Sequence, residues 1–334
     1  MKKKIGVVSL GCPKNLVDSE IMLGILKEDF EITNDETDAD IIIVNTCGFI
    51  ESAKQESINT ILEMAEHKKG KCSRLIVTGC LAERYRNQII EQIPEVDAVV
   101  GTGSYGEIRE IIEKAYKGEK PVQYGKLNEI DYLKKHRILS TQKGYAYLKI
   151  AEGCDNCCTY CVIPSLRGRY RSRSMDELIR EAEALSESGV KEIILIAQDT
   201  TRYGTDIYGE HKIVELIQKI SKIDGIEWIR LLYCYPEVVD DRLIDEIANN
   251  EKVCKYIDIP IQHISDSILK RMGRRGTGSD IKNLIRKLRN RIPDITIRTT
   301  LIVGFPGETE EDFSELYDFV KEYRFERLGV FTYS

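Results

Sequence analysis

Residues 145–161 of this 334-residue chain read YAYLKIAEGCDNCCTYC, a predicted strand followed by a loop with four cysteines. The strand, Tyr145–Ile150, opens a series in which apolar runs alternate with helix-like segments. The further predicted strands are Glu192–Ala197, Glu227–Leu232, Tyr256–Ile259, Thr296–Val303 and Leu328–Thr332, and the helical candidates include Met175–Ser188, Val239–Asn249 and Gly278–Asn290. Six such repeats favour a barrel or partial barrel of the TIM type, whose chemistry resides in the loops that follow the strands.

A second alternating series precedes this one. Its predicted strands are Ile5–Leu10, Ile41–Asn45, Leu75–Thr78 and Ala98–Val100, and its predicted helices are Asn15–Lys27, Ile50–His67, Glu83–Ile93 and Gly106–Tyr116. Continuous β-branched runs are typical of a parallel sheet covered on both faces. We therefore predict an N-terminal parallel-sheet α/β domain over residues 1–120, a polar linker over 121–143, and a barrel domain over 144–334. The chain stops just after the sixth strand, so we expect the barrel to lack its C-terminal part.

Composition restricts the function classes. The chain is 42% hydrophobic with a formal charge of −6, which argues against disorder. No apolar run approaches the roughly 20 residues of a membrane helix, so we expect no membrane partner and a cytoplasmic location. The ten cysteines follow no regular disulfide spacing, and in a cytosolic protein of this size they favour metal binding or catalysis.

The loop after Tyr145–Ile150 carries the strongest chemical signal. Cys154, Cys158 and Cys161 form a C-x3-C-x2-C pattern. Three thiolates can hold three corners of a [4Fe–4S] cluster and leave the fourth iron open to another molecule. The alternative is a zinc site that also uses Cys157. Adjacent Cys157 and Cys158 point in different directions, which makes a closed tetrahedron from this one loop awkward.

This pattern resembles the signature of the radical S-adenosylmethionine superfamily, including the aromatic Tyr160 before the last cysteine. The likeness continues through Ile163-Pro164 and Arg167-Gly168 into Tyr170-Arg171-Ser172-Arg173. It implies that the three cysteines bind the cluster, that the open iron chelates the amino and carboxylate groups of S-adenosylmethionine, and that Tyr160 lies against the adenine. Cys157 stands at a position that the superfamily leaves variable and is expected to be a spare thiol.

Three more cysteines follow predicted strands of the N-terminal sheet. Cys12, Cys47 and Cys80 each come at or just after a strand end, and each has a glycine neighbour. Because the carboxyl ends of parallel strands meet at one edge, where α/β folds bind ligands, these thiols are predicted to converge there. The alternative is that they are small buried hydrophobic residues. We expect Cys72, Cys234 and Cys254 to be structural.

These cysteines extend the resemblance to the methylthiotransferases. The matching stretches are SLGCPKNLVDSE at residues 9–20, NTCGFI at 45–50 and TGC at 78–80. Pro13-Lys14 after the first cysteine and Ala197-Gln198-Asp199-Thr200-Thr201 resemble the RimO branch, which modifies an aspartate of small-subunit ribosomal protein twelve. The family usually ends in a small β-rich TRAM domain, which we expect to be missing here.

The resemblance implies a function. The Cys154/Cys158/Cys161 cluster would pass one electron to S-adenosylmethionine, giving a 5′-deoxyadenosyl radical that abstracts hydrogen from an aspartate β-carbon. A second [4Fe–4S] cluster on Cys12, Cys47 and Cys80 would hold a sulfur that a second S-adenosylmethionine methylates before its transfer to carbon. Such chemistry needs a cofactor, because acid-base side chains cannot attack an unactivated C–H bond. No catalytic side chain beyond the cluster ligands is predicted, and the two triads should face one cavity.

The implied partners are the ribosomal protein, free or on the assembled subunit, an electron donor and a sulfur source. The alternative within the family is a tRNA adenosine methylthiotransferase of the MiaB type. A remoter alternative is a zinc-stabilised nucleic-acid-binding protein, which would leave the N-terminal cysteines unexplained.

Other polar residues follow the predicted barrel strands. Gln198 could fix the cosubstrate's amino group or the protein substrate, while Asp199 or Thr200 could instead cap a helix. By resemblance, the Ile302–Gly304 edge hydrogen-bonds the adenine, although a turn capped by Thr309-x-x-Asp312 explains the same letters. His263 is a proton-carrier candidate, but a lone histidine at a strand end is more often a satisfied hydrogen-bonding residue.

Two basic regions stand out against the negative total. Arginines alternate at 167, 169, 171 and 173, which aligns them on one side if the segment is extended. Residues 267–291 contain nine Lys or Arg against Asp280 alone. Two interpretations stay open for these regions: docking on ribosomal RNA or holding a carboxylate, and a solvated helix face, which is favoured for the helical part.

Overall fold

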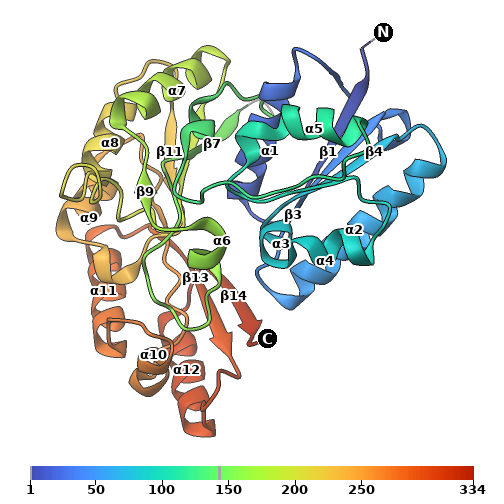
Figure 1. Ribbon diagram of the computed structural model, residues 1–334. Helices are drawn as coiled ribbons and strands as arrows, with labels where there is room; N and C mark the ends of the chain where they lie inside the picture. Colours follow the sequence, from blue (N-terminus) through green and yellow to red (C-terminus); the bar gives the residue numbers. More distant parts are fainter. Residues whose placement is uncertain (1, 142–143) are drawn as a thin grey trace. The chain divides into compact units, whose positions relative to one another are not determined.

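The computed structural model describes residues 2–141 and 144–334 and divides into two compact units (Figure 1). Unit 1 comprises Met1–Ser140 and Val162–Arg169, and unit 2 comprises Thr141–Cys161 and Tyr170–Ser334. Met1, in the predicted N-terminal domain, and residues 142–143, in the predicted linker, lie outside the described residues. The domain limits at residues 120 and 144 stay predictions.

Unit 1 is built on a parallel sheet with the strand order β2-β1-β3-β4-β5-β6. The strands are β1 (Lys4–Ser9), β2 (Glu31–Ile32), β3 (Ile41–Thr46), β4 (Arg74–Gly79), β5 (Ala98–Val100) and β6 (Val122–Gln123). Every residue of β3 is buried, as the continuous apolar run predicts for a strand covered on both faces. The predicted parallel α/β sheet is confirmed.

Helices cover both faces of this sheet (Figure 1). They are α1 (Pro13–Leu26), α2 (Glu51–Glu66), α3 (Cys80–Tyr85), α4 (Asn87–Gln92) and α5 (Ile108–Tyr116), with short 3-10 turns at Glu36–Asp38, His67–Lys69, Tyr105–Glu107 and Asp131–Lys134. Side chains from α2, α3 and α4 form one core with alternate strand residues such as Ile42, Val44 and Leu75. Helices α1 and α5 contact each other and the strands β1 and β5.

Two segments of unit 1 differ from the sequence prediction. The single helix expected over 83–93 begins earlier, at Cys80, and is broken at Arg86, whose φ of 48° lies in the left-handed region. The segment predicted as a linker supplies the edge strand β6, and it buries Tyr132 and Leu133. Its two-residue strand is too short to show a period in the sequence.

Unit 2 contains the parallel strands of the predicted partial barrel in two ladders, ordered β11-β10-β7 and β12-β13-β14. They are β7 (Tyr145–Lys149), β10 (Glu192–Ile196), β11 (Trp228–Leu231), β12 (Tyr256–Asp258), β13 (Thr296–Val303) and β14 (Arg327–Thr332). The ladders meet where Ile229 bridges Val253 and the Cys234 amide donates to the Asp258 carbonyl. A short antiparallel pair, β8 (Ala151–Glu152) and β9 (Arg171–Ser172), flanks the cysteine loop.

Helices follow the strands in turn and form an outer layer. They are α7 (Met175–Glu187), α8 (Ile213–Ile220), α9 (Asp241–Asn249), α10 (Asp266–Arg271), α11 (Gly278–Arg291) and α12 (Glu310–Tyr323), and α6 (Ile163–Arg167) belongs to unit 1. Thr309 and Asp312 form a capping box that starts α12. None of the helices in the described part of the chain has the length and apolar character of a membrane span.

Candidate functional site

The three N-terminal cysteines follow three neighbouring strands of the unit 1 sheet. Cys12 caps α1 after β1, Cys47 follows β3, and Cys80 is the first residue of α3 directly after β4. Since β1, β3 and β4 are parallel neighbours, all three residues stand at the same carboxyl edge. Cys72 precedes β4 at the opposite edge and is buried, in agreement with its exclusion from the site.

The same three thiols influence one another electrostatically. Burial is the main cause that raises the pKa of Cys80 to about 11, and Cys12 and Cys47 add to the rise. The pKa of Cys47 is likewise raised by burial and then by Cys12. For Cys12, burial acts upward but is outweighed by the charges of Lys14 and Arg167, so that its pKa is lowered. The three thiols therefore stand at one sheet edge within electrostatic reach of one another, and their role as ligands of one cluster stays a prediction.

Buried polar side chains hold the backbone around these cysteines. Asn15 donates to the carbonyls of Leu10 and Thr46, which ties the ends of β1 and β3 together. Ser57 accepts from the Cys47 amide at 3.0 Å and donates to the Cys47 carbonyl at 2.8 Å. Neither residue was singled out from the sequence, although Asn15 lies within the SLGCPKNLVDSE stretch.

Contacts within the protein explain why the residue before Cys12 is a glycine. Gly11 has a φ of +84°, and a Cβ there would lie 2.7 Å from the Cβ of Cys47 and 3.1 Å from its sulfur. Gly11 therefore allows the β1 and β3 ends to approach each other, which brings Cys12 next to Cys47. The expectation that this glycine makes room for an inorganic ligand remains a prediction.

Both candidate groups consist of three cysteine thiols, which is the donor type of iron–sulfur clusters. Within the described ranges, no three His, Cys, Asp or Glu side chains are arranged to hold one metal ion. A single zinc needs its four ligands around one point, whereas the cysteines of a [4Fe–4S] cluster bind different iron atoms and stand further apart. Three thiols at one sheet edge and three in one loop suit the second arrangement.

The barrel cysteines lie in the loop between β8 and α6. Cys154, Cys158 and Cys161 are each partly buried, and Cys157 is exposed. Burial is the main cause that raises the pKa of Cys154 to about 11, with Asp199 and Cys158 adding to it. The exposure of Cys157 agrees with its interpretation as a spare thiol.

This loop is fastened to the barrel from two sides. The Asn156 amide donates to Asp199 at 3.0 Å in the loop after β10. The Thr159 amide donates to the Met272 carbonyl after α10. A Cβ on Gly273 would lie 2.6 Å from the Cys157 carbonyl oxygen, so glycine is needed where α10 meets the cysteine loop. Asp199 caps no helix, because α8 begins only at Ile213 after Lys212.

Tyr235, in the loop after β11 and just before the 3-10 turn Pro236–Val238, contacts one of the cysteines of the barrel loop. Its hydroxyl lies 3.0 Å from the Cys158 sulfur. The buried Arg274 guanidinium stacks 3.8 Å from the Tyr235 ring centroid and pairs with Glu237 at 3.4 Å. Sequence reasoning missed Tyr235. Its position after a barrel strand on the presumed active face was the available signal.

Replacing Tyr235 by phenylalanine is expected to slow reductive cleavage of S-adenosylmethionine about ten-fold, since loss of outer-shell partners of metal ligands typically costs 10–100-fold. The initial rate of methionine formation by the reconstituted full chain measures this. Tyr317→Phe is the matched control, because Tyr317 is exposed on α12. Equal rates for the two variants would show that the Tyr235 hydroxyl does not support Cys158.

Two of the predicted cosubstrate residues share one apolar cluster. Tyr160 and Ile302 pack against Ile268, Met272 and Phe305. The Tyr160 and Phe305 rings stand edge to face with centroids 6.4 Å apart. Tyr160, from the cysteine loop, therefore lies beside the end of β13, and its contact with adenine stays a prediction.

The Ile302–Gly304 edge is partly used by the sheet. The Ile302 amide donates to the Gln262 carbonyl at 2.8 Å, and the Val303 carbonyl accepts from the Tyr333 amide at 2.9 Å. Gly304 has a φ of +73° and is exposed, and among the described residues no atom beyond its chain neighbours would lie within 4 Å of a Cβ there. The predicted adenine hydrogen bonds would have to come from the remaining backbone groups of this edge.

Gln198 belongs to a different group of side chains. Its amide donates to Glu152 at 2.6 Å, and Glu152 also accepts from Lys149 at 2.5 Å. Lys149 is fully buried and Glu152 is 3% exposed. Among the residues that the structure describes, the buried Gln198 amide oxygen has no hydrogen-bond partner. This oxygen is the atom that could accept from a cosubstrate amino group.

Glu152→Ala is expected to destabilise the protein by about 3–5 kcal/mol, because it removes the carboxylate that compensates the buried Lys149 charge. Urea unfolding of the full chain measures the change. The control is Glu227→Ala, whose partner Lys191 is half exposed and whose loss should cost less than about 1 kcal/mol. Similar losses for both variants would contradict the assignment of a buried ion pair.

The remaining candidate side chain is His263. His263 is buried, and its Nδ1 accepts from the Ser265 amide at 3.1 Å. Burial lowers its pKa, although Glu308 acts in the opposite direction. Within the described part of the chain, the His263 Nε2 is buried without a hydrogen-bond partner and lies 3.6 Å from a Glu308 carboxylate oxygen. Only Nδ1 therefore fits the satisfied-histidine interpretation, and the role of His263 as a proton carrier stays a prediction.

The basic regions do not form the expected surfaces. The row of arginines is not extended: Arg167 ends α6, Gly168 has a φ of +73°, and Arg173 is buried against Glu181 at 2.6 Å. The one-sided alignment is therefore wrong. In residues 267–291, Lys282, Arg286, Lys287, Arg289 and Arg291 pair with acidic residues. The solvated-face interpretation holds for these helical residues.

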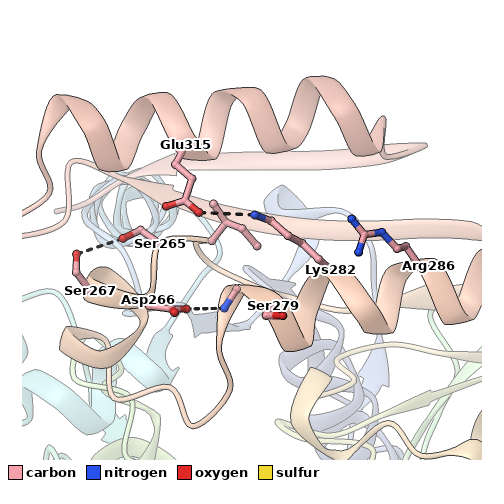
Figure 2. Close-up of a pocket in the computed structure, with 9 residues that line it drawn as sticks. Ser265, Asp266, Ser267, Ser279, Lys282, Arg286 and Glu315 are labelled. Atoms are coloured by element: carbon pink, nitrogen blue, oxygen red, sulfur yellow. Dashed lines mark hydrogen bonds and ion pairs between the residues drawn. The ribbon is translucent and has the colours of Figure 1, made fainter.

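A surface cavity of about 460 Å³ lies among α10, α11 and α12 (Figure 2). Ser265, Asp266, Ser267, Lys282 and Glu315 are among the residues that line it, and Lys282 pairs with Glu315 across it. None of the predicted site residues lines this cavity. It is therefore distinct from both cysteine triads.

Two family models match the chain, one over most of each cysteine-bearing unit. A family model described as the radical SAM superfamily matches residues 148–320, and one described as uncharacterized protein family UPF0004 matches residues 4–101. The radical S-adenosylmethionine methyltransferase TsrM from Kitasatospora setae, solved with cobalamin and a [4Fe–4S] cluster, has a TM-score of 0.69 at 16% identity, covering 99% of this chain and 72% of that one. The likeness to TsrM shows the fold alone.

Curated relatives are similar over the full length of this chain. Ribosomal protein uS12 methylthiotransferase RimO of Acetivibrio thermocellus is 63% identical over 342 residues, covering 100% of this chain and 76% of that protein. The RimO protein of Clostridium tetani is 56% identical over 334 residues, covering 100% of this chain and 75% of that protein. The chain thus spans about three quarters of the length of these relatives.

The barrel, the three-cysteine loop and the superfamily match define a radical S-adenosylmethionine enzyme, a class that uses an iron–sulfur cluster with this cosubstrate. The UPF0004 match over residues 4–101 adds a further N-terminal domain to this radical S-adenosylmethionine enzyme. The chain belongs to the RimO family of methylthiotransferases. The resemblance stated from the sequence is confirmed, and the comparisons support it over the tRNA-modifying and zinc-binding alternatives.

Proposed function

We propose that Cys154, Cys158 and Cys161 hold one [4Fe–4S] cluster and that Cys12, Cys47 and Cys80 hold a second. When bound, the first cluster supplies the electron for reductive cleavage of S-adenosylmethionine, and the second supplies a place for the sulfur that is transferred. Such cofactors perform chemistry that no side chain of this protein can. The protein supplies binding, orientation and electrostatics.

One observation carries this proposal. Three cysteines separated by more than 30 residues from one another stand at one edge of the unit 1 sheet. Buried hydrophobic cysteines would have no reason to occupy the carboxyl ends of three adjacent strands, which is where α/β folds bind ligands. The mutual effects of the three thiols on their pKa values support their proximity.

The chain's own residues orient both triads. Asn15 and Ser57 fix the backbone that presents Cys12 and Cys47. Asn156 fastens the barrel loop to Asp199, and the Tyr235 hydroxyl lies 3.0 Å from the Cys158 sulfur, to which it would donate once Cys158 binds the cluster as a thiolate. The Gln198 oxygen and the edge at Ile302 offer acceptors and donors for the polar groups of S-adenosylmethionine.

The proposed substrate is an aspartate β-carbon of ribosomal protein uS12, the protein named for the relatives. The reaction replaces hydrogen by a methylthio group. It needs a reductant and a sulfur source, which we propose are supplied by separate electron-donor and sulfur-donor partners. Because ribosomes are its target, we also propose that the enzyme acts in the cytoplasm, on uS12 either free or in the assembled small subunit.

The reconstituted chain, incubated anaerobically with S-adenosylmethionine, dithionite and sulfide, is expected to add one SCH2 unit to uS12. Mass spectrometry of a uS12 digest should place the addition on one aspartate. Total tRNA incubated in parallel should gain no methylthioadenosine. Product on tRNA and none on uS12, free or in small subunits, would refute the substrate and favour the MiaB-like alternative.

A further inference from the structure

Arg167 belongs by sequence to the barrel motif but by structure to unit 1. It follows Cys161 by six residues, yet the segment Val162–Arg169 is part of the compact unit that contains Cys12, Cys47 and Cys80. Helix α6 ends at Arg167, whose side chain is 3% exposed. A buried guanidinium is costly unless it is paired and hydrogen-bonded, so its partners indicate its purpose.

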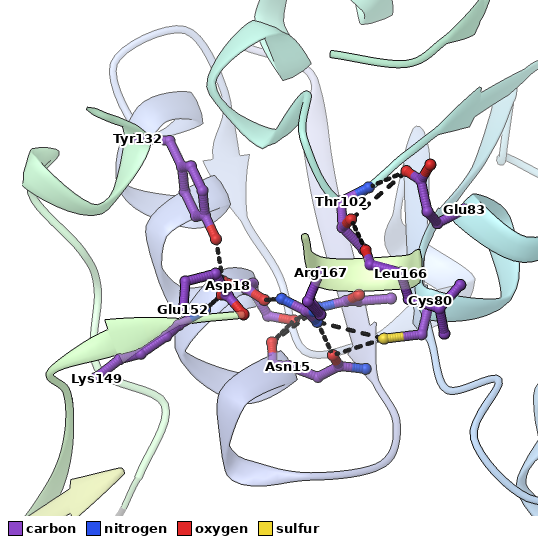
Figure 3. Close-up of polar contacts among 12 residues, drawn as sticks. Asn15, Asp18, Cys80, Glu83, Thr102, Tyr132, Lys149, Glu152, Leu166 and Arg167 are labelled. Carbon is purple, nitrogen blue, oxygen red and sulfur yellow. Dashed lines mark hydrogen bonds and ion pairs between the residues drawn. The ribbon is translucent and has the colours of Figure 1, made fainter. Parts of the chain in front are cut away.

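The partners of Arg167 include Cys80 of the N-terminal triad and residues of α1. The Arg167 Nη1 donates to the Asp18 carboxylate at 2.7 Å, and Nη2 donates to the Asn15 side-chain oxygen (Figure 3). The same Nη2 lies 3.5 Å from the Cys80 sulfur, within hydrogen-bond distance for sulfur. Asp18 is fully buried and also accepts from the Tyr132 hydroxyl. The fork of Arg167 therefore joins Cys80 to α1.

The α6 segment is anchored close to this fork. The Thr102 hydroxyl donates to the Leu166 carbonyl at 2.5 Å, and the Thr102 backbone amide donates to the Glu83 carboxylate at 2.9 Å. Gly168 follows with a positive φ, and a Cβ there would lie 3.0 Å from the Leu127 Cβ. These contacts fix the backbone of Arg167. Its guanidinium is held at the other end by Asp18 and Asn15, so that its position beside Cys80 is set by both ends of the side chain.

We propose that Arg167 is a positioning residue for the N-terminal triad, which holds the Cys80 sulfur and sets the electrostatic environment of the group bound there. The inference rests on the proposed second cluster. Hydrogen bonds to cysteine sulfurs and nearby charge are the main controls of iron–sulfur potentials. A cation beside the triad favours the more negative, reduced state, and the Asp18 carboxylate partly offsets that effect.

The test uses the full chain with Cys154, Cys158 and Cys161 changed to alanine, so that only the N-terminal cluster contributes. Its midpoint potential is measured by a redox titration followed by electron paramagnetic resonance. Arg167→Gln is expected to shift the one-electron reduction equilibrium at least ten-fold toward the oxidised state, about 59 mV to lower potential. Asp18→Asn should shift it in the opposite direction, because it leaves the guanidinium charge less compensated. Arg169→Gln, at an exposed neighbour, is the control.

Opposite shifts distinguish this role from a structural one, since loosened packing would move both potentials in the same direction. The inference is overturned if the two variants shift the midpoint potential in the same direction. It is also overturned if Arg167→Gln changes the one-electron reduction equilibrium by less than threefold. If Arg167→Gln does not fold, Asp18→Asn decides alone: a rise supports the inference, and no change or a fall overturns it. Absence of iron from the parent protein would instead refute the second cluster itself.

Discussion

Alanine at Cys12, Cys47 and Cys80 together is expected to abolish methylthiolation while leaving reductive cleavage of S-adenosylmethionine intact. These cysteines lie in unit 1 and the barrel cysteines in unit 2, so that the barrel loop keeps its ligands and its anchors at Asp199 and Met272. Product should fall more than about 100-fold, since loss of outer-shell partners alone costs 10–100-fold. The measurements are 5′-deoxyadenosine by chromatography and modified uS12 by mass spectrometry.

Cys72→Ala is the control for this triple variant, because Cys72 is also a buried unit 1 cysteine but precedes β4 at the other edge of the sheet. It should retain both activities. A triple variant that still methylthiolates uS12 would show that the N-terminal thiols are not needed for sulfur transfer.

Alanine at Cys154, Cys158 and Cys161 is expected to abolish both measured activities. If the proposed function is correct, these three thiols hold the cluster that supplies the electron, and sulfur transfer in unit 1 depends on cleavage of the cosubstrate. Formation of 5′-deoxyadenosine should drop more than about 100-fold, and product on uS12 should drop with it.

Cys157→Ala is the matched control within the same loop, since this thiol is exposed and adjacent to Cys158. It should cleave S-adenosylmethionine at the parent rate. A loss in Cys157→Ala equal to that in the triple variant would indicate a four-cysteine site and would revive the zinc interpretation.

Features set by local periodicity were predictable from the sequence. The strands β3 and β5 begin where the apolar runs begin, because continuous β-branched runs mark buried parallel strands, and β13 has its predicted bounds with alternating burial. The convergence of Cys12, Cys47 and Cys80 was predictable for the same reason, since parallel topology alone brings strand ends to one edge.

Features set by tertiary contact were not predictable. The alternating arginines suggested an extended basic row, but α6 and the turn at Gly168 bury Arg167 against Asp18 instead. Nothing in the sequence near Cys161 indicates that the next residues fold with unit 1. Tyr235 and Gly273 likewise meet the cysteine loop only through the barrel, across more than 70 residues of chain.

The central claim is that this one chain carries two separate iron–sulfur sites, each on its own three cysteines. Anaerobic iron and labile-sulfide analysis of the reconstituted protein tests it most directly. We predict ~8 iron and ~8 sulfide per chain for the parent, ~4 of each for either triple alanine variant, and none when all six cysteines are replaced. A parent with ~4 iron, or an N-terminal triple variant with as much iron as the parent, would contradict the account.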